Sequence, residues 1–229
     1  MLIHGWGSCF TDTWEVTGIT SLFGDVHREC IGIDLLGHGT APKPHDPNDY
    51  QDLGARVRDA LPDTPVDAVG FSLGALVLLE ELKKTPERFH RVVLAGIGDG
   101  VFEETHDEDH ERILAGLAGT APEDDHAEDD PIARLFGQYA GRRSNDIKAL
   151  AAVLKRPRST PFSESDLAQI TNAVLVVIGD DDFGLPANRL ANSFPNGILR
   201  ILKNTDHFKT PESFQFIDAM LEFLEAQPI

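Results

Sequence analysis

Short apolar segments rich in β-branched residues alternate along this chain with longer segments in which apolar residues recur at helical spacing. Apolar runs of about four to eight residues are typical of strands buried on both faces. The predicted strands are residues 1–4, 29–34, 66–71, 91–97, 173–179 and 197–202. Because helical segments separate them, we expect an α/β fold in which a parallel six-stranded sheet is covered by helices on both faces.

Two segments show the clearest helical periodicity. Residues 73–84 form a regular pattern that ends next to Pro86, a residue that disfavours continuation of a helix. Residues 212–226 carry apolar residues at the same spacing, namely Phe214, Ile217, Leu221 and Leu224. We expect a helix at each of these places.

Strand signals disappear between about residues 99 and 167, where two acidic stretches lie at residues 103–111 and 123–130. Two apolar stripes at helical spacing follow, formed by Ile132, Leu135, Phe136 and Tyr139 and by Ile147, Leu150 and Leu154. Stripes of this kind usually face a core. We therefore predict a core domain from residues 1–99 and 168–229, and a helical cap insert from residues 100–167.

The charge balance excludes two classes of partner. The chain has 20 basic and 38 acidic residues, a net charge of −18, which repels phosphate backbones and anionic lipid surfaces. We expect neither nucleic acid nor membrane as a partner, and no run of apolar residues is long enough to span a bilayer.

Cys9 and Cys30 form no disulfide framework or C-x-x-C pair, and no export signal is recognised, so a cytoplasmic location is expected.

One pair of histidines suggests a metal site. His106 and His110 are four residues apart among acidic neighbours, so a helix there would present them on one face. Acidic runs with scattered histidines are more often solvated surface, and no phosphate-binding loop is present elsewhere. We therefore predict no metal and no cofactor.

A pentapeptide of chemical interest lies between a predicted strand and a predicted helix. Residues 70–74 read Gly-Phe-Ser-Leu-Gly, which puts Ser72 on a tight strand-to-helix turn. Such a turn needs glycines at both flanks because Cβ atoms at Gly70 and Gly74 would collide with the neighbouring strand and helix. This context favours a nucleophilic serine over a glycine-rich turn with a capping serine.

Further motifs accompany the pentapeptide. Residues 4–7 read His-Gly-Trp-Gly, residues 34–40 read Asp-Leu-Leu-Gly-His-Gly-Thr, and two loops near the carboxyl end contain residues 179–182, Gly-Asp-Asp-Asp, and residues 206–208, Asp-His-Phe. With them the chain resembles the α/β-hydrolase superfamily over nearly its whole length outside the acidic insert. The resemblance implies an oxyanion loop at residues 4–7 and a structural role for the turn at residues 34–40.

The resemblance also implies a catalytic triad in the order serine, acid, histidine. It gives Ser72 as the nucleophile and His207 as the general base. Family spacing favours Asp182 as the acid, while Asp99 occupies an alternative acid position at the end of another strand. A serine needs such a base, and the base needs an acid that orients it.

By the same resemblance, two backbone N–H groups stabilise the oxyanion, those of Leu73 and Trp6. A second interpretation of Trp6 is that its side chain only packs in the core. The leading functional prediction is a serine hydrolase that cleaves carboxylic esters of small molecules through an acyl-enzyme. Carbon–carbon bond hydrolases, lactonases and perhydrolases share the triad, and a non-catalytic ligand-binding protein of the same fold is the alternative from another class.

The chain departs from the superfamily at its start. Members ordinarily have two strands before the His-Gly loop, which here begins at His4. If the family strand order holds, the strand from Glu29 to Asp34 becomes an uncovered edge of a wholly parallel sheet. Because exposed edges invite pairing, we predict a homodimer through this edge, or low stability of the single chain.

Overall fold

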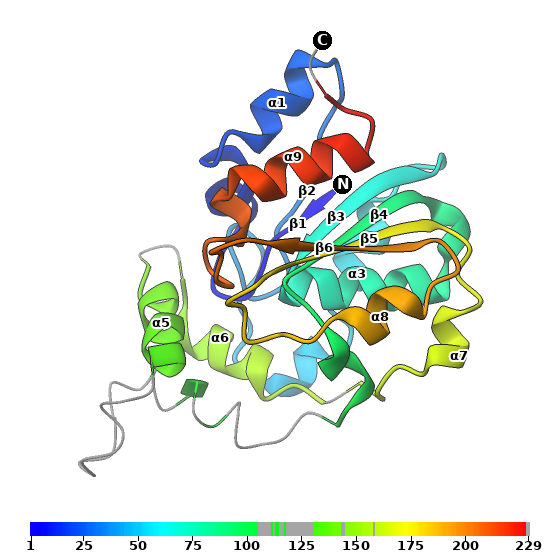
Figure 1. Cartoon of the computed structure of the whole chain (residues 1–229). Helices are drawn as coiled ribbons and strands as arrows, with labels where there is room; N and C mark the ends of the chain where they lie inside the picture. The colour runs from blue at the N-terminus through cyan, green and yellow to red at the C-terminus, as the bar shows by residue number, and fades with distance from the viewer. Residues whose placement is uncertain are drawn as a thin grey trace.

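The computed structural model describes residues 1–104, 111, 113–114, 117, 131–142, 145–157 and 159–227. Six parallel strands in these residues form one sheet in the order β2-β1-β3-β4-β5-β6 (Figure 1). The strands are β1 (Leu2–Ile3), β2 (Gly32–Ile33), β3 (Val66–Phe71), β4 (Phe89–Ala95), β5 (Ala173–Gly179) and β6 (Gly197–Leu202). The predicted α/β class and the wholly parallel six-stranded sheet are confirmed.

Three of the predicted strands have the predicted bounds, and three differ. Strand β4 begins at Phe89 instead of Arg91, because buried Phe89 already pairs with Val66 of β3, and it ends at Ala95. Strands β1 and β2 are only two residues long, shorter than the predicted residues 1–4 and 29–34.

The contacts that follow β2 account for its shortening. Like β6 at the other end of the sheet, β2 is an edge strand, and it pairs with β1 on one side only. Directly after it, the Asp34 carboxylate accepts hydrogen bonds from the backbone N–H groups of Phe10 and Thr40, which turns the chain away from the sheet. The Phe10 ring also lies against Gly32. The edge position of this segment is confirmed, and self-association through it stays a prediction.

Helices cover both faces of the sheet, as predicted (Figure 1). The helices α1 (Ile19–Asp25) and α9 (Phe214–Phe223) lie on one face. The other face is covered mainly by α3 (Leu73–Lys84), α8 (Asn188–Asn192) and α6 (Ile147–Leu154). The remaining helices are α2 (Ala55–Ala60), α5 (Pro131–Ala140) and α7 (Glu164–Leu167).

Short helical turns connect these elements. A π-helical turn spans Thr11–Glu15, and 3₁₀ turns span Pro47–Tyr50, Pro86–Arg88, Asp99–Phe102 and Thr210–Glu212. The helix predicted over residues 212–226 begins later, because Ser213 has extended backbone angles that separate the last 3₁₀ turn from α9.

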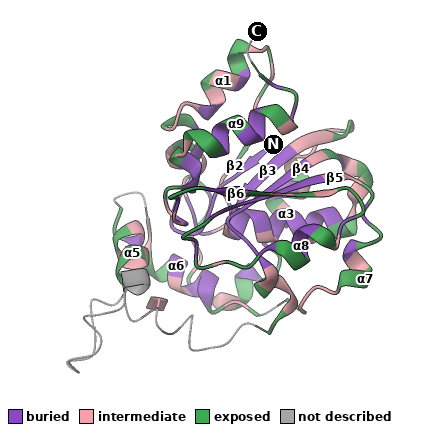
Figure 2. Ribbon diagram, viewed as in Figure 1, coloured by how far each residue is buried: buried purple, intermediate pink, exposed green. Residues whose placement is uncertain are grey.

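Two buried clusters form the core, one on each face of the sheet (Figure 2). Alternate side chains of β4 divide between them, with Val92 and Leu94 in one cluster and Val93 and Ala95 in the other. Because successive side chains of a strand point to opposite faces, a strand covered by helices on both faces is apolar throughout. This is why the central strands appear in the sequence as continuous apolar runs.

Helices α5 and α6 correspond to the two predicted apolar stripes, but the stripes are only partly buried. Leu150 and Leu154 of α6 belong to the main core cluster, while Ile147 is 47% exposed. In α5, Phe136 packs against the cluster, and Leu135 is 39% exposed. The prediction that both stripes face the core is therefore wrong for Leu135 and Ile147, which sit at the margins of their contact surfaces. No helix in the described ranges is both long and apolar enough to cross a membrane.

Candidate active site

Ser72 occupies the turn between β3 and α3. Its backbone has φ 51° and ψ −116°, a conformation that residues with a side chain rarely adopt. Its N–H donates to the carbonyl of Ala95 at 2.8 Å, and its own carbonyl accepts from Ala75 at 2.9 Å. The turn is thus held in its strained form by the neighbouring strand on one side and by the first turn of the helix on the other.

Gly70 and Gly74 make this turn possible, as the pentapeptide predicts. A Cβ atom on Gly70 would lie 2.5 Å from the carbonyl oxygen of Gly74, and one on Gly74 would lie 2.4 Å from that of Ile3. Both contacts are with backbone atoms, which cannot rotate away. The N-terminus of α3 therefore packs directly against β1, beside the loop that follows this strand.

Ser72, His207 and Asp182 form a continuous chain of hydrogen-bonding distances. His207 Nε2 lies 3.0 Å from Ser72 Oγ, and His207 Nδ1 lies 3.0 and 3.1 Å from the two carboxylate oxygens of Asp182. Because a carboxylate only accepts, Nδ1 carries the hydrogen and Nε2 accepts from the serine hydroxyl. His207 and Asp182 are 3% and 4% exposed, so water does not compete for these contacts.

Asp182 and Asp180 of the acid loop and Asp99 have different partners. Asp182 also accepts from the N–H of Gly184 at 2.8 Å, which holds its carboxylate toward the histidine. Asp180 accepts from the N–H of Thr205. The carboxylate of Asp99 instead accepts from the first N–H groups of α8, at 2.8 Å from Leu190 N. The structure thus brings Asp182 to His207, whereas Asp99 caps a helix.

The backbone N–H groups of Leu73 and Trp6 are the predicted oxyanion donors, and the loop that contains Trp6 passes beside Ser72, where a Cβ atom on Gly5 would lie 3.3 Å from Ser72 Cβ. Neither N–H group donates to a protein acceptor among the described residues. Leu73 N belongs to the first turn of α3, where N–H groups lack intrahelical partners and the helix dipole is positive. Side-chain packing of Trp6 is present as well: Trp6 is buried, and its Nε1–H donates to the Leu150 carbonyl at 3.1 Å. The two interpretations of Trp6 are therefore compatible.

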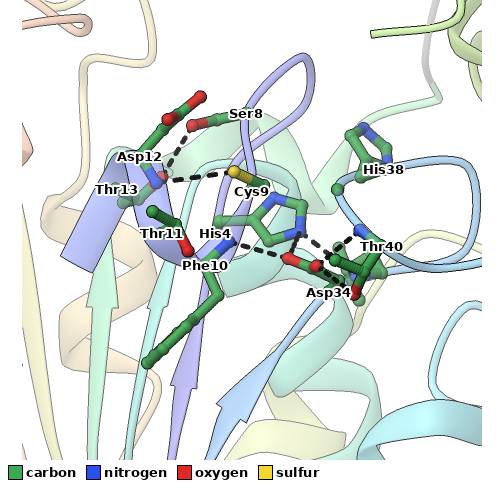
Figure 3. Close-up of polar contacts among 12 residues, drawn as sticks. His4, Ser8, Cys9, Phe10, Thr11, Asp12, Thr13, Asp34, His38 and Thr40 are labelled. Carbon is green, nitrogen blue, oxygen red and sulfur yellow. Dashed lines mark hydrogen bonds and ion pairs between the residues drawn. The ribbon is translucent and has the colours of Figure 1, made fainter. Parts of the chain in front are cut away.

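The loop after β1 is connected to the turn after β2 by buried polar groups (Figure 3). His4 Nδ1–H donates to the Gly5 carbonyl at 2.7 Å, and His4 Nε2 accepts from the N–H of Leu35 at 3.1 Å. Burial alone would raise the pKa of Asp34, but hydrogen bonds from Phe10 and Thr40 outweigh it and lower that pKa. The motif at residues 34–40 thus supports the loop that contains Trp6.

His38 lies beside His4 in this network, with ring centroids 5.1 Å apart. Its Nδ1–H donates to the Leu36 carbonyl at 3.0 Å, and its Nε2 has no hydrogen-bond partner in the described part of the chain. Burial, assisted by the neighbouring His4, lowers the pKa of His38 to about 3. The imidazole is therefore neutral in the folded protein at physiological pH.

Aromatic rings surround His207. The rings of Phe183, Phe71 and Phe208 lie 4.3, 5.1 and 5.5 Å from it, measured between centroids. Sequence reasoning did not identify these residues, although Phe183 and Phe208 directly follow Asp182 and His207. Phe183 is 49% exposed and covers the histidine from the solvent side. Apolar rings here keep the histidine and its partners in a surrounding of low polarity.

A cavity of about 380 Å³ opens beside Ser72 and His207. Its apolar walls include Leu76, Phe162 and Phe183. This volume lies within the range of small-molecule sites, which combine apolar walls with a few polar groups. The site can therefore hold a small organic substrate against the serine.

The possible metal pair of His106 and His110 lies outside the described residues. Within the ranges that are described, no group of three or more histidine, cysteine, aspartate or glutamate residues is arranged to hold a metal ion.

The first prediction concerns the contact between α3 and β1. Gly74→Ala should lower the free energy of unfolding by about 1–3 kcal/mol, because the new Cβ would displace a backbone carbonyl of β1. Gly24→Ala in α1 is the control: nothing lies within 4 Å of its Cβ position, and alanine should stabilise that helix by up to about 1 kcal/mol. Urea unfolding checks both, and equal stabilities would contradict the close approach described here.

The second prediction concerns pH. His38 has its ordinary pKa of 6.5 when unfolded and about 3 when folded, so the unfolded state binds the proton more readily. The contribution of neutral His38 to the free energy of unfolding is therefore complete above pH 6.5 and is lost as pH falls toward 3. Over this range the free energy of unfolding falls by up to about 1.4 kcal/mol per pH unit.

His38→Gln should reduce this slope of unfolding free energy between pH 6 and about 4. His90→Gln, at an exposed position of β4, serves as the control and should keep most of the slope. Urea unfolding at a series of pH values measures it. If the slope of His38→Gln equals that of the unaltered protein, burial of neutral His38 is not the cause.

Comparison with known proteins agrees with this fold. A family model described as "Alpha/beta hydrolase family" matches residues 1–222. A pimeloyl-[acyl-carrier protein] methyl ester esterase of Neisseria meningitidis is 34% identical over 105 residues. The aligned part is 41% of this chain and 34% of that relative, so the chain spans about a third of its length.

Solved structures match over most of the chain. An enzyme described as degrading N-acyl homoserine lactones has a TM-score of 0.70 at 21% identity, covering 96% of this chain and 90% of the other. A bromoperoxidase from Bacillus anthracis has a TM-score of 0.71 at 20% identity, with 98% and 90% covered. At these identities the likeness concerns the fold. Because the family model extends over nearly the whole chain, this protein belongs to the α/β-hydrolase family.

Proposed function

We propose that this protein is a serine hydrolase that cleaves carboxylic esters through an acyl-enzyme intermediate. The observation that carries the proposal is the buried hydrogen-bonded chain from Ser72 through His207 to Asp182, which opens into a cavity. A serine hydroxyl alone is a poor nucleophile at neutral pH. A histidine whose Nε2 accepts the serine proton, and whose Nδ1–H is held by a carboxylate, supplies the missing base.

The reaction proceeds in two halves. Ser72 Oγ attacks the ester carbonyl while its proton passes to His207 Nε2, and negative charge develops on the carbonyl oxygen. The N–H groups of Leu73 and Trp6 are the proposed donors to this oxygen, and such donors are each worth about 3–4 kcal/mol of barrier. His207 then protonates the leaving alcohol, which departs and leaves Ser72 acylated.

Water completes the cycle. His207 takes a proton from a water molecule, whose oxygen attacks the acyl carbon, and then returns the proton to Ser72 as the acid leaves. Asp182 stays ionised throughout and stabilises the charged imidazole. The named activity of the Neisseria relative, cleavage of a methyl ester, supports an ester as the substrate. A lactone is a cyclic ester that the same steps open, and the similarity to a lactone-degrading enzyme favours it as a second substrate class.

A fluorophosphonate probe tests the nucleophile. The protein should gain one covalent adduct, located at Ser72 by peptide mass spectrometry, and Ser72→Ala should gain none. Ser193→Ala, at a partly exposed serine that follows α8, is the matched control and should label fully. A folded protein that is not labelled would contradict the proposed serine chemistry.

The acid is tested by comparing two aspartates. Asp182→Asn should lower kcat for p-nitrophenyl acetate by about 10⁴-fold, because an asparagine at this position favours the wrong histidine tautomer. Asp99→Asn should instead cost up to about 1 kcal/mol of unfolding free energy through a weaker cap of α8, with kcat retained. The reverse pattern would assign the acid to Asp99.

A further inference from the structure

The cavity beside Ser72 follows one face of helix α3. Ser72, Leu76 and Glu80 all line it, and they are four residues apart, so they share that face. At 1.5 Å per residue, this face extends for about 12 Å from the serine to Glu80. A substrate in the cavity therefore has one end at the nucleophile and another about two helical turns away.

The wall at that distance contains a cation. Arg156, in the segment that follows α6, lines the same cavity as Ser72 and is partly buried. Its Nη1–H donates to the Val153 carbonyl at 2.8 Å. No carboxylate oxygen of a described residue lies within 4 Å of its guanidinium. A guanidinium has five N–H donors in a planar fork, so most of the Arg156 donors have no acceptor among the described residues.

Glu80 attracts the Arg156 guanidinium, but its own carboxylate has another partner. Its Oε1 accepts from the hydroxyl of Ser159 at 2.6 Å. Burial lowers the pKa of Arg156, and the attraction of Glu80 opposes this effect only in part. The described residues therefore offset only part of the free-energy cost of removing water from this cation. A bound anion would offset the rest.

The charge of the remaining wall limits which anion fits. Glu103, which is exposed, lines the cavity together with Glu80. Two carboxylates on the wall of the same cavity would repel a phosphate dianion more strongly than a group with a single negative charge. A carboxylate carries that single charge, and its two oxygens match the guanidinium fork.

We propose that the preferred substrate is an ester whose far end carries a carboxylate, and that Arg156 is the residue that selects it. This inference rests on the proposed function and names the substrate class of the same site. An uncharged acyl chain would displace water from the Arg156 guanidinium without offering a hydrogen-bond acceptor in its place. A terminal carboxylate would accept hydrogen bonds from the guanidinium. A site built to bind a polar group rejects analogues that lack the group.

The test is a ratio of two specificity constants. The substrates are the mono-p-nitrophenyl ester of suberic acid and the same ester with its free carboxyl methylated, which have equal chain lengths and differ in the terminal charge. The ratio of kcat/KM, charged over methylated, should exceed about 10 in the unaltered protein, which is the effect of one charge-assisted hydrogen-bonded pair. A ratio of one or less would overturn the inference.

Variants assign the preference to a residue. Arg156→Gln should lower the ratio by about 10- to 100-fold, and Arg156→Lys, which keeps the charge but not the fork, should lower it less. Lys155→Gln removes the neighbouring cation, which is exposed and does not line the cavity, and should keep the ratio of the unaltered protein. Glu80→Gln should raise the ratio because it removes a competing carboxylate. An unchanged ratio in both Arg156 variants would overturn the role of Arg156.

The outcomes also separate this inference from the proposed function. Hydrolysis of the methylated ester through Ser72, with no preference for the charged one, would leave the esterase activity in place and overturn the carboxylate selection. Absence of hydrolysis of both esters, together with absence of fluorophosphonate labelling, would overturn both. Because the ratio compares two substrates on the same protein sample, partial loss of folded protein in a variant cancels.

Discussion

The contact between the first turn of α3 and strand β1 is the constraint on which the site depends. It brings two backbones together at Gly74 and leaves no room for a side chain there. The same contact places the N-terminus of the helix beside the loop after β1, because a Cβ atom on Gly74 would also lie 2.5 Å from the carbonyl oxygen of His4. The strained backbone of Ser72 is held because hydrogen bonds on both sides determine it.

Burial governs the electrostatics of the site. His207 and Asp182 are almost inaccessible to water and satisfy each other, so the pair is held rigidly and oriented toward the serine. His4 and His38 are buried as neutral groups that connect backbone segments. Arg156 differs from both cases, because it is a charged group on a cavity wall without a close carboxylate among the described residues. For this reason we infer that Arg156 binds a group of the substrate.

Much of the candidate site could be predicted because its signals are local. The pentapeptide around Ser72 combines a strand, two glycines and a helix within neighbouring residues, and each part restricts the backbone on its own. The loop of Asp182 follows β5, which is apolar throughout, and the loop of His207 follows β6, which is apolar except for Gly197 and Arg200. The resemblance to the α/β-hydrolase superfamily supplied the roles, which stay a proposal, and the structure places the three side chains within hydrogen-bonding distance of one another.

The sequence by itself determined the α/β class, the elbow at Ser72 and the bounds of β3, α3, β5 and β6, because periodicity and glycine positions act over a few residues. Family spacing favoured Asp182 over Asp99 as the acid, but only the tertiary structure shows that Asp182 lies within hydrogen-bonding distance of His207 while Asp99 accepts from N–H groups of α8. The tertiary structure also decided the exposure of Ile147 and the position of Arg156 on the cavity wall. These depend on contacts between segments far apart in the chain, which no local pattern specifies.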